Sequence, residues 1–301
     1  MAHHSAVLAV SRESVAKPAG FIVDLVGAQT RVSYFTNLTN KGQAHLENED
    51  VIPPLPPFSE TYFEWVDLLE SVRDARDRYV ICELGAGWGR WCVRAARAVR
   101  QLNPLPFRCI AVEAEPQHFR WMREHFADNG IDPDDHDLLW AAAGANSGVV
   151  PFAIGAADTW YGQSVCDGEL PSLSARKRRR LRARGLMGLP PRVSDVRGVS
   201  WVPMMTLGEV VTDEPHIDLL DLDIQGLELE VLTAAAQLVD RRVRRVHVGT
   251  HSRDIEEGLR RLFRELDWRC VNDYPCQSIT QTPYGEISFQ DGVQTWIHPR
   301  R

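Results

Sequence analysis

The stretch at residues 79–89 constrains the fold of this chain more than any other. It reads Tyr-Val-Ile-Cys-Glu-Leu-Gly-Ala-Gly-Trp-Gly, so an apolar run ends at Glu83 and glycines follow at alternate positions, Gly85, Gly87 and Gly89. The apolar run is typical of a buried parallel strand, and the glycines suit a turn in which the backbone passes close to a ligand. Apolar residues then recur at helical spacing over 91–102. The sequence therefore predicts a strand, a glycine turn and a helix, which together form the first half of a nucleotide-binding α/β unit.

The spacing of the glycines narrows the choice of ligand. In the dinucleotide-binding fingerprint, G-x-G-x-x-G, the third glycine comes one residue later than it does here. The tighter G-x-G-x-G pattern resembles the first motif of S-adenosylmethionine (SAM)-dependent methyltransferases, which implies a loop that approaches an amino-acid tail and a ribose. Glu83 is then a candidate to accept a hydrogen bond from the cationic amine of methionine. The alternative is an ordinary strand–helix turn that binds nothing.

Further candidates follow the next two expected strands. The strand at 107–114 ends near Glu113, whose two carboxylate oxygens could accept both hydroxyls of a ribose, with Glu115 as the second choice. A solvated acidic helix start is the alternative reading, and it fits Glu115 better than Glu113. In the third strand, near 138–143, Trp140 or the small residues after it are candidates to pack against an adenine ring, although a tryptophan of the core fits equally well.

Two later strands also end in polar residues. The strand at 217–224 carries three carboxylates among apolar residues, Asp218, Asp221 and Asp223. A carboxylate in a buried strand is costly unless it is paired or functional. Asp223 stands where this strand ends, before the helix at 227–239, and His251 follows the strand at 244–248. Because parallel strands end at one edge of a sheet, we expect Asp223 and His251 to share an edge with the glycine turn.

Three segments together are similar to the FkbM-type family of SAM-dependent methyltransferases. They are Glu83-Leu-Gly-Ala-Gly-Trp-Gly89, Ala111-Val-Glu-Ala-Glu-Pro116 and Ile217-Asp-Leu-Leu-Asp-Leu-Asp-Ile-Gln-Gly-Leu-Glu228. The last is the most specific, because the family usually carries an Asp-x-x-Gly-x-Glu run after an apolar strand. The resemblance covers roughly 79–298. This chain departs from the family pattern at three positions, with Glu83 for Asp, Gly87 for Asn and Asp221 for Lys.

The resemblance implies a class I, Rossmann-like α/β fold with SAM as the cofactor. The mostly parallel sheet would have helices on both faces, and we expect two late strands, at 268–272 and 286–289, to add an antiparallel C-terminal edge hairpin. Glu83 and the three glycines would hold SAM, with Glu113 on its ribose. Several family members methylate hydroxyls on sugars or polyketide-derived metabolites, so a small-molecule or glycan acceptor is expected here.

Methylation of a hydroxyl benefits from a general base within hydrogen-bond reach. His251 is the first candidate for this base because imidazole titrates near neutrality, with Asp223 and Glu228 as orienting or basic carboxylates. A loop histidine that satisfies backbone groups is the alternative. Two other functions remain open: a nicotinamide-dependent oxidoreductase with Arg90 near a phosphate, and a non-catalytic scaffold that binds partners through 174–192.

The 301 residues divide into an N-terminal extension with a leading helix, 1–75, and a methyltransferase domain, 76–301, with a basic insertion at about 155–198. Between 176 and 192 eight basic residues meet no acidic one, which suggests an anionic acceptor, a solvated helix or a mobile lid. The net charge of −7 argues against a general nucleic-acid binder.

The cysteines and the N-terminus bear on compartment. The six cysteines show no C-x-x-C pair and no zinc-like spacing, so we expect reduced thiols, no metal site and a cytoplasmic protein. We expect no signal peptide, because the N-terminus lacks a basic start followed by a long apolar stretch. We expect no membrane span, because the sequence has no apolar run of about 18 residues. The sequence leaves the oligomeric state open.

Overall fold

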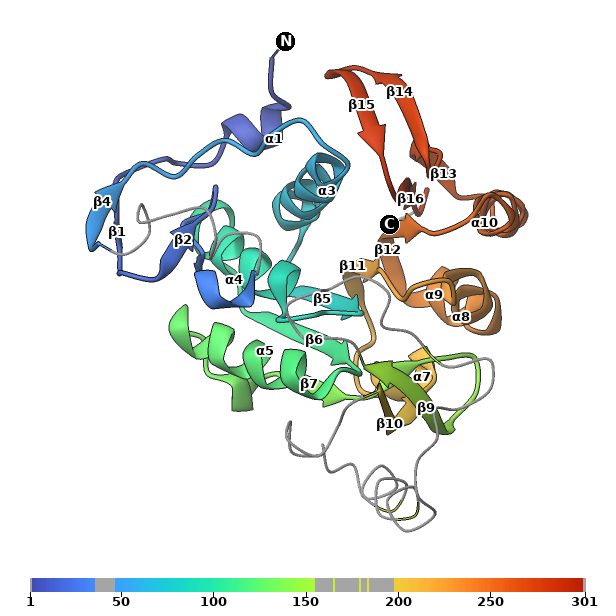
Figure 1. Ribbon diagram of the computed structural model, residues 1–301. Helices are drawn as coiled ribbons and strands as arrows, with labels where there is room; N and C mark the ends of the chain where they lie inside the picture. The colour runs from blue at the N-terminus through green and yellow to red at the C-terminus, as the bar shows by residue number, and fades with distance from the viewer. Residues whose placement is uncertain are drawn as a thin grey trace.

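A seven-stranded sheet forms the centre of the computed structural model, which describes residues 2–35, 47–154 and 198–299 together with residues 165, 179 and 183 (Figure 1). In spatial order the strands are β13 (Arg269–Tyr274), β16 (Gly292–Ile297), β12 (Val243–Thr250), β11 (Ile217–Leu222), β5 (Tyr79–Leu84), β6 (Phe107–Glu113) and β7 (Asp137–Trp140). The strands from β12 to β7 are parallel, and β16 is antiparallel to both of its neighbours.

Helices cover both faces of this sheet, as the alternation of strands and helices predicts. One face packs against α3 (Thr61–Asp74), α4 (Arg90–Leu102) and α5 (Pro116–Asp128). The other packs against α7 (Leu207–Val210), α8 (Glu228–Ala234), α9 (Ala236–Arg242) and α10 (Arg253–Glu265). Successive strand residues point to opposite faces, so Ile81 joins the first layer and Cys82 the second. The predicted class I α/β fold is confirmed.

The C-terminal edge of the sheet is antiparallel, as expected, but one of its strands was misplaced by the sequence analysis. The edge pair consists of β13 and β16. The segment at 286–289 instead belongs to β15 (Gly285–Phe289), which pairs with β14 (Ser278–Thr282) in a separate hairpin (Figure 1). The segment that follows, β16, is buried along most of its length and enters the sheet beside β12.

A small sheet flanks the carboxyl ends of the central strands. It contains β8 (Ala142–Ala143), β10 (Gly198–Met205) and β9 (Gly148–Ile154) in that order. The basic insertion predicted at 155–198 joins β9 to β10, so it enters and leaves the fold next to this edge. Of the basic residues at 176–192, all but Arg179 lie outside the described residues.

The N-terminal residues pack against the first helical layer. They form α1 (Ser5–Leu8), β1 (Val15–Lys17), β2 (Phe21–Val23), β3 (Gln29–Arg31) and β4 (Glu49–Val51). Val7 and Leu25 are buried in the same core cluster as residues of α3 and α4. The division of the chain at residue 75 stays a prediction. Among the helices that the structure describes, none combines the length and apolarity needed to cross a membrane.

A buried ionic cluster joins α3 to the sheet. Asp67 lies 2.6 Å from Nη1 of Arg245 and 2.7 Å from Nδ1 of His247, and the hydroxyl of Thr295 donates to it. Burial by itself would raise the pKa of Asp67, but the hydrogen bond from His247 and the charge of Arg245 outweigh it and lower this pKa. Asp67 therefore stays ionised and fixes α3 against β12 and β16.

Replacing Asp67 with Ala is expected to lower the free energy of unfolding by about 3–5 kcal/mol, because the buried charges of Arg245 and His247 would lose their partner. Urea denaturation measures this value. Asp74→Ala, which removes a half-exposed carboxylate from the same helix, serves as the control and should change stability by less than about 0.5 kcal/mol. Equal effects of the two substitutions would refute the importance of the cluster.

Candidate functional site

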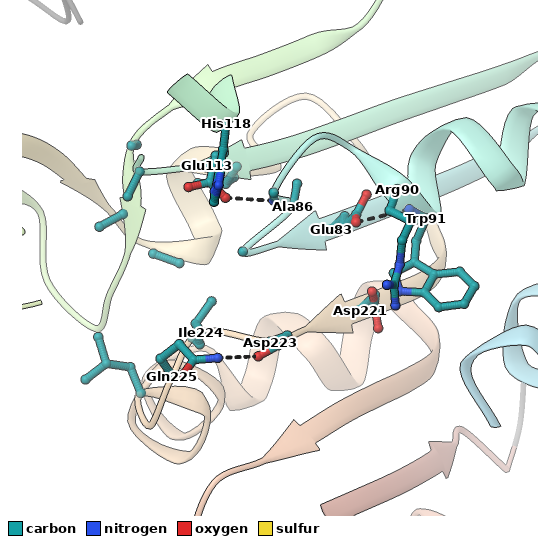
Figure 2. A pocket seen from close by; sticks show the side chains of 18 of the residues that line it. Glu83, Ala86, Arg90, Trp91, Glu113, His118, Asp221, Asp223, Ile224 and Gln225 are labelled. Carbon is teal, nitrogen blue, oxygen red and sulfur yellow. Dashed lines mark hydrogen bonds between the residues drawn. The ribbon is translucent and has the colours of Figure 1, made fainter. Parts of the chain in front are cut away.

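A cavity opens at the carboxyl ends of β5, β6 and β11 (Figure 2). Its empty volume is about 980 Å³, which includes some of the open solvent at its mouth. It is lined by residues of the glycine turn, of strand ends and of α3 and α4, namely Glu64, Glu83, Gly85, Ala86, Gly87, Arg90, Trp91, Val112, Glu113, Ala114, His118, Ala141, Ala142, Ala143, Phe152, Val165, Asp221, Asp223, Ile224, Gln225 and Leu227. The predicted strand ends thus meet at one edge, where open α/β sheets bind their ligands.

The three glycines of the turn share a positive φ but differ in their surroundings. A Cβ on Gly85 would lie 1.9 Å from the backbone oxygen of Asp223, so this position tolerates no side chain. A Cβ on Gly87 would meet nothing within 4 Å and would project into open space beside the cavity. Gly89 is not among the lining residues, and a Cβ there would collide with Met122 and Phe126 of α5. Gly89 therefore serves helix packing.

Glu83 lines the cavity and also begins the next helix. Its two carboxylate oxygens accept hydrogen bonds from the backbone amides of Trp91 (3.1 Å) and Cys92 (2.9 Å), in the first turn of α4. Such amides are otherwise unpaired at a helix start, and the positive end of the helix dipole favours a carboxylate there. Burial nevertheless raises the pKa of Glu83 to about 7. Its predicted contact with a ligand amine stays a prediction, and each oxygen already accepts one backbone amide.

Glu113 ties the glycine turn to the end of β6. One of its oxygens accepts from the amide of Gly87 at 2.7 Å, and the other accepts from the amide of Glu115 at 2.6 Å. Burial raises the pKa of Glu113 to about 6. Glu115 faces elsewhere, since it is the N-cap of α5 and accepts from the amide of His118. The structure thus brings Glu113, and not Glu115, to the cavity wall.

Small and apolar residues form one end of the cavity. Ala114, the three alanines at 141–143, Phe152 and Val165 line it. Trp140 is absent from this lining: it is buried against Ala114 and Phe152, and its indole N–H donates to the backbone oxygen of Ala114 at 2.9 Å. Trp140 therefore supports the wall from behind, while the small residues after it face the cavity.

His251, Asp223 and Glu228 are brought together, as the strand ends predict. Nδ1 of His251 lies 2.9 Å from the buried carboxylate of Glu228, and Nε2 lies 3.3 Å from Asp223 and 3.8 Å from Asp291. Glu228 also accepts the backbone amides of Ile224 and Gly226, which fixes the turn after β11. Of the three, only Asp223 lines the cavity; its side chain is 54% exposed.

The carboxylates around His251 decide its charge. Burial alone would lower its pKa, but the hydrogen bonds and charges of Asp223 and Glu228 outweigh burial and raise this pKa to about 10. At neutral pH the ring is therefore an imidazolium, which has no lone pair with which to accept a proton. The base role predicted for His251 assumed an ordinary imidazole, and the surrounding acids argue against it.

Glu64 and Asp221 line the cavity but were not among the predicted site residues, and Arg90 was named only for the nicotinamide alternative. Glu64 of α3 pairs with Arg90 of α4 at 3.3 Å, and Asp221 lies on β11. The carboxylates within the 217–224 strand were a usable signal for Asp221, whereas no local pattern marks Glu64. Its position depends on how α3 crosses the strand ends. No group of three or more potential ligands for a metal ion occurs among the described residues.

Comparison with known proteins identifies a methyltransferase family. Residues 85–270 match the sequence profile described as the methyltransferase FkbM domain. A protein of Jannaschia sp. (strain CCS1), described as a candidate methyltransferase, is 29% identical over 240 residues, which cover 78% of each chain.

Two solved structures illustrate the structural similarity. Methyltransferase FkbM from Methylobacillus flagellatus KT aligns with a TM-score of 0.42 and 11% identity, over 74% of this chain and 45% of that one. Precorrin-6y C5,15-methyltransferase from Geobacter metallireducens GS-15 aligns with a TM-score of 0.39 and 14% identity, over 77% of this chain and 85% of that one.

The raised pKa of Glu113 predicts a pH-dependent stability. Because its folded-state pKa of about 6 lies above the ordinary 4.5, its contribution is fully present below the ordinary value and is lost as the pH rises through 6. The stability of the ligand-free wild type relative to Glu113→Gln should therefore fall by about 2 kcal/mol between about pH 3 and pH 7. Urea denaturation across this range tests it, with Glu257→Gln, at an exposed site on α10, as the control. A difference that is constant with pH would contradict the assignment.

Proposed function

This chain belongs to the FkbM methyltransferase family, and we propose that it transfers a methyl group from SAM to a hydroxyl of a sugar or another small metabolite. The observation that supports SAM most directly is the order of chemical groups across the sheet. The alanines at 141–143 follow β7 on one side, Glu113 ends β6 beside the glycine turn after β5, and Asp221 lies on β11 on the other side, where Figure 2 also shows Arg90. SAM has a matching order: an apolar adenine, a ribose diol and a charged amino-acid end.

The residues present fit the cofactor at each part. The wall formed by 141–143 and Phe152 suits an adenine ring, because small side chains leave room for it. Glu113 keeps acceptor capacity for ribose hydroxyls beyond its two bonds to backbone amides, since an ionised carboxylate can accept about four hydrogen bonds. The open space at Gly87 allows close approach to the backbone.

When bound, SAM supplies an electrophilic methyl group on a sulfonium, and the chain has to align the acceptor oxygen and exclude water. Asp223 is our candidate to accept the proton of the acceptor hydroxyl, because it lines the cavity and remains accessible. His251 and Glu228 act as positioning residues: Glu228 holds the imidazolium, and the imidazolium lies 3.3 Å from Asp223.

The charges near Asp223 favour an acceptor that is neutral at the reacting end. Asp291 lies 3.8 Å from His251, and burial, with a smaller contribution from the charge of Asp223, raises the pKa of Glu60 and of Asp291. An anionic group placed next to these carboxylates would be repelled. The anionic acceptor suggested by the basic segment rests on residues outside the described ones.

The nicotinamide alternative requires Arg90 to face a phosphate. Its guanidinium lies 3.3 Å from Glu64, and Glu83, Asp221 and Asp223 line the same part of the cavity. A pyrophosphate would meet these carboxylates, which disfavours a dinucleotide. The scaffold alternative predicts that the cavity binds no cofactor.

Calorimetric titration separates these functions. We expect the wild type to bind SAM and its product S-adenosylhomocysteine (SAH), and not to bind NADPH. Gly87→Val should abolish SAM binding, because the side chain would project into the cavity from a left-handed backbone. Gly20→Val is the matched control, since Gly20 also has a positive φ and open space around it but lies away from the cavity. Binding of NADPH in place of SAM, or of neither, would refute the proposal.

Asp223→Asn is expected to lower turnover by about 100-fold or more, because an amide cannot accept the hydroxyl proton, while SAM affinity changes little. His251→Gln should lower turnover by less and also leave SAM affinity intact. Transfer of label from SAM to compounds in an extract of the source cells measures turnover, with the exposed Asp254→Asn as the control. Full activity of Asp223→Asn would remove this residue from the mechanism.

A further inference from the structure

Asp221 is a buried carboxylate at the centre of the main sheet. It lies on β11, in register with Glu83 of β5 and His247 of β12. Its exposure is 6%, and it lines the cavity, on the side where Figure 2 also shows Arg90. Within the described part of the chain, no group donates a hydrogen bond to it and no cation pairs with it within 4 Å. Asp221 therefore presents an unsatisfied acceptor to the cavity.

The neighbours of Asp221 are engaged with other groups. The ionisable side chains that face it are His247 on β12, Glu83 on β5, Glu64 on α3, Arg90 on α4 and Asp223 on its own strand. His247 is held by Asp67 at 2.7 Å, and Arg90 lies 3.3 Å from Glu64. Glu83 accepts two helix amides. More carboxylates than cations therefore surround this corner of the cavity.

An ionised carboxylate in such a place is unfavourable by several kcal/mol unless a cation joins it. Burial, together with the charges of Glu64, Glu83 and Asp223, raises the pKa of Asp221 well above its ordinary value, although the charge of His247 opposes this. In the ligand-free protein these surroundings favour the protonated form of the side chain over the ionised form. A cation that entered this corner would stabilise the ionised form.

We propose that Asp221 receives the α-ammonium group at the amino-acid end of the cofactor, an inference that rests on the proposed SAM-dependent function. An ammonium group is compact and offers three donors, so it suits a carboxylate with free acceptors and acidic neighbours. Glu83 was the candidate for this contact in the sequence, but each of its oxygens already accepts one backbone amide of α4. Asp221, in register beside it, accepts no hydrogen bond from the described residues and so offers more acceptor sites.

Binding of the ammonium group also moves a proton. Asp221 releases its proton to the solvent as the cation arrives, and a carboxylate and an ammonium then face each other. At a pH between the pKa values of the free and the ligand-bound side chain, ligand binding therefore releases protons from this residue. Glu83, with a pKa of about 7, can add a fraction of a proton, so the informative quantity is the difference between wild type and an Asp221 variant.

Calorimetric titration with SAH at several pH values, in buffers of different ionisation enthalpy, measures the protons released. The wild type is expected to release more protons than Asp221→Asn at one or more of these pH values. The substitution should weaken SAH binding by about 10- to 100-fold, as expected for the loss of a hydrogen bond between charged groups. An SAH analogue with hydrogen in place of the α-amine should bind equally well to both proteins.

Asp254→Asn is the control, because Asp254 is an exposed carboxylate on α10 outside the cavity lining; it should keep the wild-type SAH affinity and proton release. Thermal unfolding of Asp221→Asn should show an unchanged or higher midpoint, since the change removes a buried ionisable group without partners. Wild-type proton release in Asp221→Asn, or unchanged SAH affinity, would overturn the inference. Absence of SAH binding to the wild type would instead refute the proposed function.

Discussion

The bridge that Glu113 makes between two backbone amides is the interaction on which the shape of the cavity depends. A single carboxylate holds the amide of Gly87 in the glycine turn and the amide of Glu115 at the start of α5. The turn after β5 and the turn after β6 are therefore kept at a fixed separation by one side chain. Because the carboxylate is buried, its ionisation is unfavourable, and the two amides offset part of that penalty.

The direction in which strand residues point decides which polar side chains reach the site. Glu83, Asp221 and His247 stand in register on adjacent strands, so all three face the layer that contains α3 and α4. Only the part of this layer near the carboxyl ends of the strands opens to the cavity. Deeper in, Asp67 and Arg245 neutralise each other with His247, whereas at the cavity Asp221 has no such partner. The same face of the sheet thus changes from a satisfied structural cluster to an unsatisfied binding surface.

Acidic groups also set the charge of His251, which follows β12. Glu228 is fully buried, holds the turn after β11 through two backbone amides, and contacts His251. This arrangement makes His251 a fixed cation and leaves Asp223 as the group that faces the ligand space. From the sequence, either the histidine or the carboxylate at a strand end could be the proton acceptor, with the other as the positioning residue. The number of acidic groups around the histidine decides which of the two accepts the proton.

Much of the fold was predictable because periodicity and glycine placement are local properties. The parallel strands from 79 onward, the glycine turn and the shared edge of Gly85, Glu113, Asp223 and His251 were all expected. One strand of the C-terminal edge was predicted wrongly. The segments 286–289 and 292–297 both suit a strand, and only burial beside β12 selects 292–297 as the strand of the central sheet.

The sequence by itself determined the α/β architecture, the family and the edge of the sheet at which a ligand would bind. The tertiary structure alone decided what each residue does there. The three glycines share a positive φ, but a side chain would meet a backbone at Gly85, open space at Gly87 and a neighbouring helix at Gly89. Trp140 packs into the core, and Asp221 has no partner among the described residues. These differences arise because burial and pairing depend on residues far apart in the chain, which no local pattern can specify.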